Sequence, residues 1–103
     1  MLGKALRFSR ATFPIGRAKE RYSLPWGAVS VYDAPQFRAG VVVSKKVLKK
    51  AHDRNRLRRR LYEAIGHVLP KNPPAIGLAV FPRKEALTAP YTAIVEDLKK
   101  VIL

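Results

Sequence analysis

Residues 41–65 read VVVSKKVLKKAHDRNRLRRRLYEAI, a run of valines followed by a stretch that is dense in lysine and arginine. A continuous run of β-branched residues is typical of a strand that is buried on both faces. The second half of the stretch places apolar residues three and four positions apart, which is the spacing of an amphipathic helix. The sequence therefore predicts a buried strand that leads into a strongly basic helix.

We expect this helix to cover Asp53–Leu69, because Asp53 is a suitable N-cap and Pro70 follows the last residue. At about 100° per residue, one side of the helix is apolar and consists of Leu57, Leu61, Ala64, Ile65 and Val68. The opposite side carries Arg56, Arg59 and Glu63, flanked by Asn55 and Arg60. Glu63 is expected to pair along the helix with Arg59 or Arg60.

The rest of the chain predicts further strands and one more helix. The expected strands are Trp26–Tyr32, Arg38–Ser44 and Ile76–Phe81, and the expected final helix is 90–103. The apolar stripe of that final helix contains Ala93, Ile94, Leu98, Val101 and Ile102. Residues 1–25 are poorly patterned, and Pro14 and Gly16 restrict any helix there to Lys4–Thr12 at most.

This order of elements favours an α+β fold, a two-layer sandwich in which one central sheet is covered by helices. With 103 residues the chain is long enough for one modest core, so we expect a single domain over residues 1–103. Trp26 is expected to belong to that core.

The charge of the chain indicates a polyanionic partner. There are 21 Lys and Arg residues against 7 Asp and Glu, a formal net charge of +14, and nine of the basic residues fall within Lys45–Arg60. No cysteine is present, which excludes disulfides and cysteine-ligated metals. No apolar run is long enough to span a bilayer, and 1–12 lacks the pattern of a secretion signal. We therefore expect a cytoplasmic protein that binds nucleic acid rather than a membrane.

The side chains of the basic helix point to RNA. The planar fork of arginine donates two parallel hydrogen bonds to a phosphate, and Asn55 offers a donor and an acceptor for a base edge or a 2′-OH. Lys45 and Lys46, at the end of the preceding strand, extend the positive surface. RNA fits better than DNA, because a surface that reads phosphates and 2′-OH groups need not enter a groove.

Two segments of this region together resemble a known family. V-V-V-S-K-K-V over Val41–Val47, followed after a short link by R-N-R-L-R-R over Arg54–Arg59, is similar to the signature of the bacterial ribonuclease P protein. The order of the later elements, an apolar strand with a following basic residue and then an amphipathic helix, also resembles that family. The chain departs from the pattern at Tyr62, where the family often has another basic residue.

The resemblance implies a fold with a left-handed β–α–β crossover, similar to the second domain of a small-subunit ribosomal protein. It implies that the helix contacts the catalytic ribonuclease P RNA and that the protein assists removal of the 5′ leader from precursor tRNA. The RNA, with bound Mg²⁺, would perform the hydrolysis, so we expect no catalytic residue and no metal ligand in this chain. We also expect that it requires no protein partner. The expected RNA-binding residues are Lys45, Lys46, Arg54, Asn55, Arg56, Arg58, Arg59 and Arg60.

The resemblance also implies a cleft for the single-stranded leader, between the sheet and the N-terminal segment. The candidates are Ser30 and Tyr32, which share one face of a predicted strand, and Phe8 and Phe13. Aromatic rings stack on unpaired bases, but Tyr32 and Phe13 are equally compatible with packing in the core.

Two other functions are compatible with the same composition. A structural RNA-binding protein of the ribosomal type would have a similar basic α+β domain, without any role in cleavage. A protein that binds a membrane surface through an amphipathic helix is disfavoured, because the sheet needs the Leu and Ile stripe for its own core. His52 and His67 have no partners that suggest a metal site or an acid–base pair and are interpreted as surface histidines.

Overall fold

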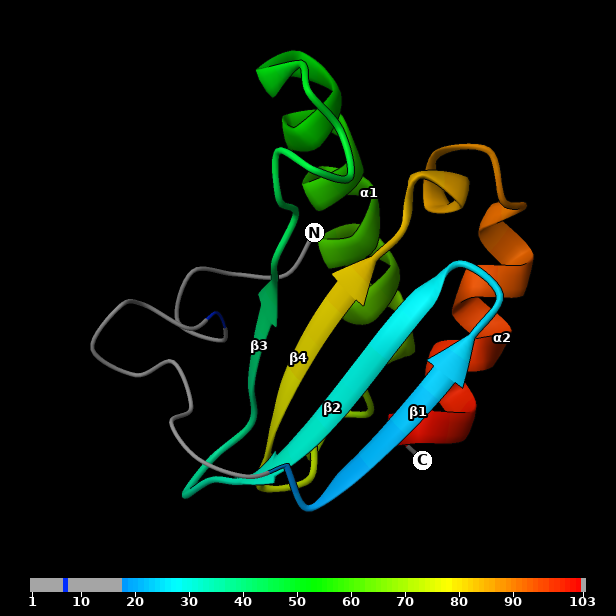
Figure 1. The fold of residues 1–103 in the computed structure, drawn as a ribbon. Helices are drawn as coiled ribbons and strands as arrows, with labels where there is room; N and C mark the ends of the chain where they lie inside the picture. The colour runs from blue at the N-terminus through cyan, green and yellow to red at the C-terminus, as the bar shows by residue number, and fades with distance from the viewer. Residues whose placement is uncertain (1–6, 8–17, 103) are drawn as a thin grey trace.

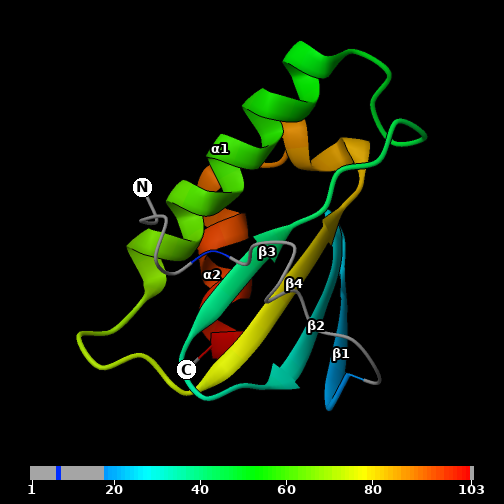
Figure 2. The ribbon, with the colours of Figure 1, turned by 90° about the vertical axis from the view of Figure 1, so that its left-hand side faces the viewer.

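The computed structural model describes Arg7 and residues 18–102. Its elements, in chain order, are β1 (Glu20–Leu24), β2 (Gly27–Asp33), β3 (Arg38–Val41), α1 (Ala51–Val68), β4 (Ile76–Pro82), the 3₁₀ helix η2 (Lys84–Leu87) and α2 (Tyr91–Ile102). The four strands form one sheet in the order β1-β2-β4-β3. Both α-helices lie on the same side of this sheet (Figures 1 and 2), which confirms the predicted two-layer α+β sandwich.

The connection from β3 to β4 has an unusual hand. β3 and β4 are adjacent and parallel, whereas β1, β2 and β4 pair antiparallel. In Figure 1 both parallel strands point upward, β4 lies to the right of β3, and α1 lies behind the sheet, as the turned view in Figure 2 confirms. A crossover with this geometry is left-handed, and nearly all other β–α–β units are right-handed. The left-handed crossover implied by the family resemblance is therefore present.

The core lies between the sheet and the helices. Alternate residues of the strands point toward α1 and α2, and the central ones, Val29, Leu78 and Val80, are fully buried. Trp26 is 2% exposed and donates from its indole Nε1 to Oδ2 of Asp97 on α2, at 3.0 Å. The expected core role of Trp26 is thus confirmed, and its polar atom has a partner, as a buried indole requires.

One strand was missed by the sequence analysis. β1 forms a hairpin with β2, in which Leu24 is paired with Gly27 across a two-residue turn. Its residues are exposed or half-buried, as expected for an edge strand, so it has no apolar run to reveal it. A side chain at Gly27 is excluded, because its Cβ would lie 2.7 Å from the Phe81 carbonyl oxygen and from Cα of Pro82.

Three predicted details are wrong. α1 begins at Ala51, and Asp53 lies within the first turn instead of capping it, where a carboxylate still complements the helix dipole. β3 ends at Val41, and Val42 is exposed, so the valine run is not buried on both faces. In α2, Ala93 is exposed and Val95 takes its place in the buried stripe.

The helix expected within Lys4–Thr12 falls outside the described residues except for Arg7. Arg7 forms an isolated parallel bridge with Ala39 of β3, and its guanidinium carbon lies 4.5 Å from the centre of the Tyr62 ring. The Tyr62 hydroxyl also accepts the Val41 N–H at 3.1 Å. Tyr62 therefore links α1 to β3.

Candidate nucleic-acid interface

The apolar side of α1 anchors the helix to the rest of the protein. The five residues predicted for this side, Leu57, Leu61, Ala64, Ile65 and Val68, are the buried residues of the helix. Because these residues fix the rotation of α1 about its axis, Asn55, Arg56, Arg59 and Glu63 face outward and are exposed. The predicted outward face of the helix is therefore confirmed for these four residues, whereas Arg60, which was predicted to flank it, is half-buried.

The link between β3 and α1 is held by Arg54. Its guanidinium Nη1 donates to the carbonyl oxygens of Leu48 at 2.9 Å and Lys49 at 2.7 Å, and the side chain is half-buried. Lys45 and Lys46 are exposed in the same link. Arg54 thus shapes the segment that carries the two lysines, a role that was not predicted for it.

Two more of the expected RNA-binding residues interact with each other. Arg58 donates a hydrogen bond from Nη2 to the side-chain oxygen of Asn55, and it is half-buried whereas Asn55 is exposed. The amide of Asn55 is therefore held by its neighbour one turn along α1, with its NH₂ group directed elsewhere.

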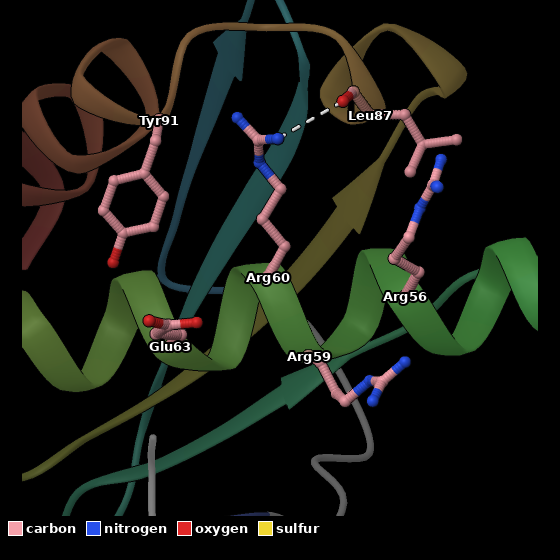
Figure 3. A pocket seen from close by; sticks show the side chains of 6 residues that line it. All are labelled: Arg56, Arg59, Arg60, Glu63, Leu87 and Tyr91. Atoms are coloured by element: carbon pink, nitrogen blue, oxygen red, sulfur yellow. Dashed lines mark hydrogen bonds between the residues drawn. The ribbon is translucent and has the colours of Figure 1, made fainter.

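Arg60 connects α1 to the segment before α2. Its guanidinium donates to the carbonyl oxygen of Leu87 at 3.3 Å (Figure 3). It also donates to the carbonyl oxygen of Ala89. Its Nε atom is buried and has no hydrogen-bond partner within the described part of the chain. Unlike the exposed Arg56 and Arg59, Arg60 is half-buried and directs its charge toward the protein itself.

Replacement of Arg60 by Met is expected to lower the free energy of unfolding by about 1–3 kcal/mol. Met keeps most of the apolar stem, but the Leu87 and Ala89 carbonyls lose a charged donor. Urea denaturation measures this change. The control is Arg59→Met at the neighbouring exposed position, for which we expect a change within about 0.5 kcal/mol. Equal effects of the two substitutions would contradict the structural role of Arg60.

The exposed arginines border a pocket of about 830 Å³. It is lined by three arginines of α1 together with an acid, an aliphatic residue and an aromatic residue, namely Arg56, Arg59, Arg60, Glu63, Leu87 and Tyr91 (Figure 3). Glu63 forms no ion pair with any residue in the described part of the chain, so its predicted pairing with Arg59 or Arg60 is wrong. Leu87 and Tyr91 were not predicted, because they come from other elements.

A second, smaller hollow of about 300 Å³ adjoins the β3–α1 link. Lys46 and Val47 line it from that link, and Arg83, Lys84 and Glu85 line it from the end of β4 and from η2. The guanidinium of Arg83 donates to the Leu24 carbonyl oxygen at 2.5 Å, which fixes it at the end of the sheet. The positive surface therefore extends from α1 to residues that follow β4.

The sheet face opposite the helices carries the candidates for leader binding. Ser30 is 7% exposed and Tyr32 is half-buried, and both lie on this face, whereas Phe8 and Phe13 lie outside the described residues. Register places Ser30 beside Ala79 and Arg21, and Tyr32 beside Gly77. The face therefore has small residues at its centre and a tyrosine on one side.

Phe81 and Val42 are the exposed large hydrophobic residues of the described chain, at 38% and 39%. Register pairs Phe81 with Ala28, so it lies on the same sheet face as Ser30 and Tyr32. Phe81 is the last residue of the predicted strand Ile76–Phe81. Because β4 is nearly all apolar, its sequence does not show which residues face the helices. The exposure of Phe81 follows only from the pairing of β4 with β2.

Two other features, a metal site and a membrane-spanning helix, were searched for among the described residues. No group of three or more His, Cys, Asp or Glu side chains that could hold a metal ion occurs there. None of the helices seen in Arg7 and 18–102 has the length and apolar character needed to cross a membrane.

Comparison with known proteins gives one consistent result. The sequence pattern of the family described as Ribonuclease P matches residues 5–103. A ribonuclease P protein component from Paramagnetospirillum magneticum is 44% identical over 66 residues, which cover 63% of this chain and 49% of that protein. One from Synechocystis sp. is 31% identical over 68 residues, which cover 66% and 55%. The chain spans about half the length of these curated relatives.

Solved structures show the same fold. The RNase P protein from Thermotoga maritima has a TM-score of 0.63 at 25% identity, with 81% of this chain and 80% of that chain covered. A Staphylococcus aureus RNase P protein mutant has a TM-score of 0.71 at 21% identity, with 95% and 86% covered. Since the family pattern covers nearly the whole sequence and the fold agrees, this chain belongs to the ribonuclease P protein family.

Proposed function

We propose that this chain is the protein component of a ribonuclease P holoenzyme in the cytoplasm and assists removal of the 5′ leader from precursor tRNA. Family membership supports the general role. The observation that carries the assignment of a surface is the outward face of α1, where Arg56 and Arg59 are exposed and directed away from the core. The catalytic RNA binds here, through phosphate contacts that are strong and largely independent of sequence.

The RNA-binding surface also includes Lys45 and Lys46, which are exposed beside the start of α1. Arg54, Arg58 and Arg60 contribute in a different way, since each already donates to an oxygen of the protein. They hold the link, the Asn55 amide and the pocket floor in place. Their charges still add to the field that attracts RNA.

The single-stranded leader contacts the sheet face opposite the helices in this proposal, at the residues of that face that are not buried. Tyr32, which is half-buried, and Phe81, which is 38% exposed, offer aromatic rings for stacking on unpaired bases. Arg21 is exposed on the same face and supplies a phosphate contact. Ser30, which was predicted as a leader contact, is only 7% exposed and is left out of this set.

The chain itself performs no bond cleavage in this proposal. Mg²⁺ would be held by the catalytic RNA and the substrate rather than by residues of this chain, and it would supply an activated water for the hydrolysis. The protein lowers the Mg²⁺ demand of the reaction, because its cations neutralise phosphates that would otherwise repel each other.

The test is cleavage of precursor tRNA by a bacterial ribonuclease P RNA at low Mg²⁺, with and without the chain. We expect the chain to stimulate cleavage. Tight binding to the RNA without stimulation would contradict the proposal and would favour a structural RNA-binding protein. High Mg²⁺, at which the RNA needs less help with charge neutralisation, is the internal control, and the stimulation is expected to shrink there.

A further inference from the structure

Phosphate binding alone gives no role to the carboxylate of Glu63. It is exposed and borders the same pocket as Arg56, Arg59 and Arg60, yet it has no ion-pair partner within the described part of the chain. A lone acid on such a surface repels phosphate and weakens binding. A carboxylate is also a pure acceptor of hydrogen bonds. Glu63 is therefore suited to a ligand that brings donors of its own.

Tyr91 forms one wall of the pocket next to this carboxylate. In Figure 3 its ring is above Glu63 and its hydroxyl points down toward the carboxylate. Burial, and then the negative charge of Glu63, raise the pKa of the Tyr91 phenol, whereas Arg60 lowers it. The ring of His67 lies edge-on to that of Tyr91, with centroids 6.5 Å apart and an interplanar angle of 71°. Tyr91 thus presents a neutral, positioned aromatic ring.

The floor of the pocket is also fixed. Arg60 is held by the carbonyl oxygens of Leu87 and Ala89, so its guanidinium stays in place without a ligand. Leu87 adds an apolar contact on the side opposite Tyr91, beside Arg56 (Figure 3). The volume of about 830 Å³ is within the range of about 300–1,000 Å³ that is usual for small-ligand sites.

These groups together match one RNA base. A carboxylate accepts two parallel hydrogen bonds from adjacent donors, and only guanine presents two adjacent donors, N1–H and N2–H₂, on its Watson–Crick edge. Adenine and cytosine place an acceptor beside their donor, and uracil places acceptors on both sides of its single donor. Unpaired bases in RNA are recognised by stacking on aromatic side chains and by hydrogen bonds to these edges.

We propose that this pocket binds an unpaired guanosine nucleotide, with the base against Tyr91, its Watson–Crick edge on Glu63 and its phosphate on Arg56 and Arg59. Arg59 and Arg56 are four and seven residues before Glu63, or about 6 and 10 Å along the helix. This separation is comparable to that between the base edge and the phosphate of one nucleotide. The inference rests on the proposed function in taking RNA as the partner, and it adds a base preference to a surface otherwise expected to have none.

The test measures binding of short single-stranded RNAs to the full chain by fluorescence anisotropy. A pentanucleotide of uridines with one central guanosine is compared with the same RNA carrying a central adenosine. We expect about tenfold tighter binding of the guanosine RNA, the size of effect that one bidentate base contact provides. Equal affinity of the wild-type chain for the two RNAs would overturn the proposal.

Two variants identify the residues responsible. Glu63→Gln is expected to reduce the preference for guanosine to nearly one, without weakening binding of the adenosine RNA, because it removes a negative charge. Tyr91→Leu is expected to weaken both RNAs about tenfold, since stacking is tolerant of sequence, and to leave their ratio unchanged. The matched control is Glu96→Gln on α2, which removes an exposed carboxylate that does not line the pocket. A guanosine preference that survives in Glu63→Gln would also overturn the proposal.

A third arm separates the two possible sources of the nucleotide. If 5′-GMP displaces the guanosine RNA and 5′-AMP does not, a free nucleotide is sufficient for the pocket. If neither mononucleotide competes while the RNA preference persists, the ligand is a nucleotide within RNA. None of these measurements needs the catalytic RNA. A failed cleavage assay with an intact guanosine preference would therefore refute the proposed function alone, and the reverse result would refute the pocket alone.

Discussion

The double substitution Arg56→Ala, Arg59→Ala is expected to weaken binding to the catalytic RNA by about 10- to 100-fold and to abolish most of the stimulation of cleavage at low Mg²⁺. Both guanidinium groups are exposed on the outer face of α1, where each can form charge-assisted hydrogen bonds with a phosphate. Alanine preserves the helix. The dependence of log K on log salt concentration is expected to become shallower by about 1.5, because two phosphate contacts are lost.

The control for this variant must have the same net charge. Lys99→Ala, Lys100→Ala removes two exposed cations from the last turn of α2, outside the basic surface of α1. We expect this control to change RNA affinity only a few-fold, through the overall field of the protein. Equal losses in the two variants, in filter binding at several salt concentrations, would contradict a specific RNA surface on α1.

Leu61→Ala is expected to lower the free energy of unfolding by about 3–5 kcal/mol, since a fully buried leucine leaves a cavity when it is truncated. Leu61 is 0% exposed and lies in the buried stripe that fixes the rotation of α1. A domain of this size has a total stability of about 5–15 kcal/mol, so the variant is close to the unfolding transition. Urea denaturation followed by circular dichroism measures the loss. Leu61→Met, which nearly conserves volume, is the control and is expected to lose less than about 1.5 kcal/mol.

Anions are expected to restore part of what Leu61→Ala removes. The chain has a formal charge of +14, and a ligand that binds only the folded state shifts the folding equilibrium toward it. Sulfate should therefore raise the melting temperature of the variant more than chloride does at matched ionic strength. RNA binding should recover in parallel. A variant that is fully folded and still fails to bind RNA would show that Leu61 acts on the interface directly rather than through stability.

The interior of the fold was largely predictable because its signals are local. The buried side of α1 and the apolar runs of β2 and β4 follow from periodicities of 3.6 and 2 residues, which are visible between residues close together in the sequence. The resemblance at Val41–Val47 and Arg54–Arg59 predicted the crossover that the structure contains. β1 was not predicted, because an edge strand with exposed and half-buried residues needs few apolar ones.

The sequence by itself thus determined which side of α1 is buried, which side is basic and to which family the chain belongs. Only the tertiary structure decided what the charged groups on that basic side do. Arg60 is a donor to Leu87 and Ala89, 27 and 29 residues away, and Glu63 faces Tyr91 of another helix. The hydrogen-bond partner of a long side chain is one of the groups that other elements place within its reach. The identity of that partner depends on how the helices and strands are placed, and the periodicity within one element does not predict it.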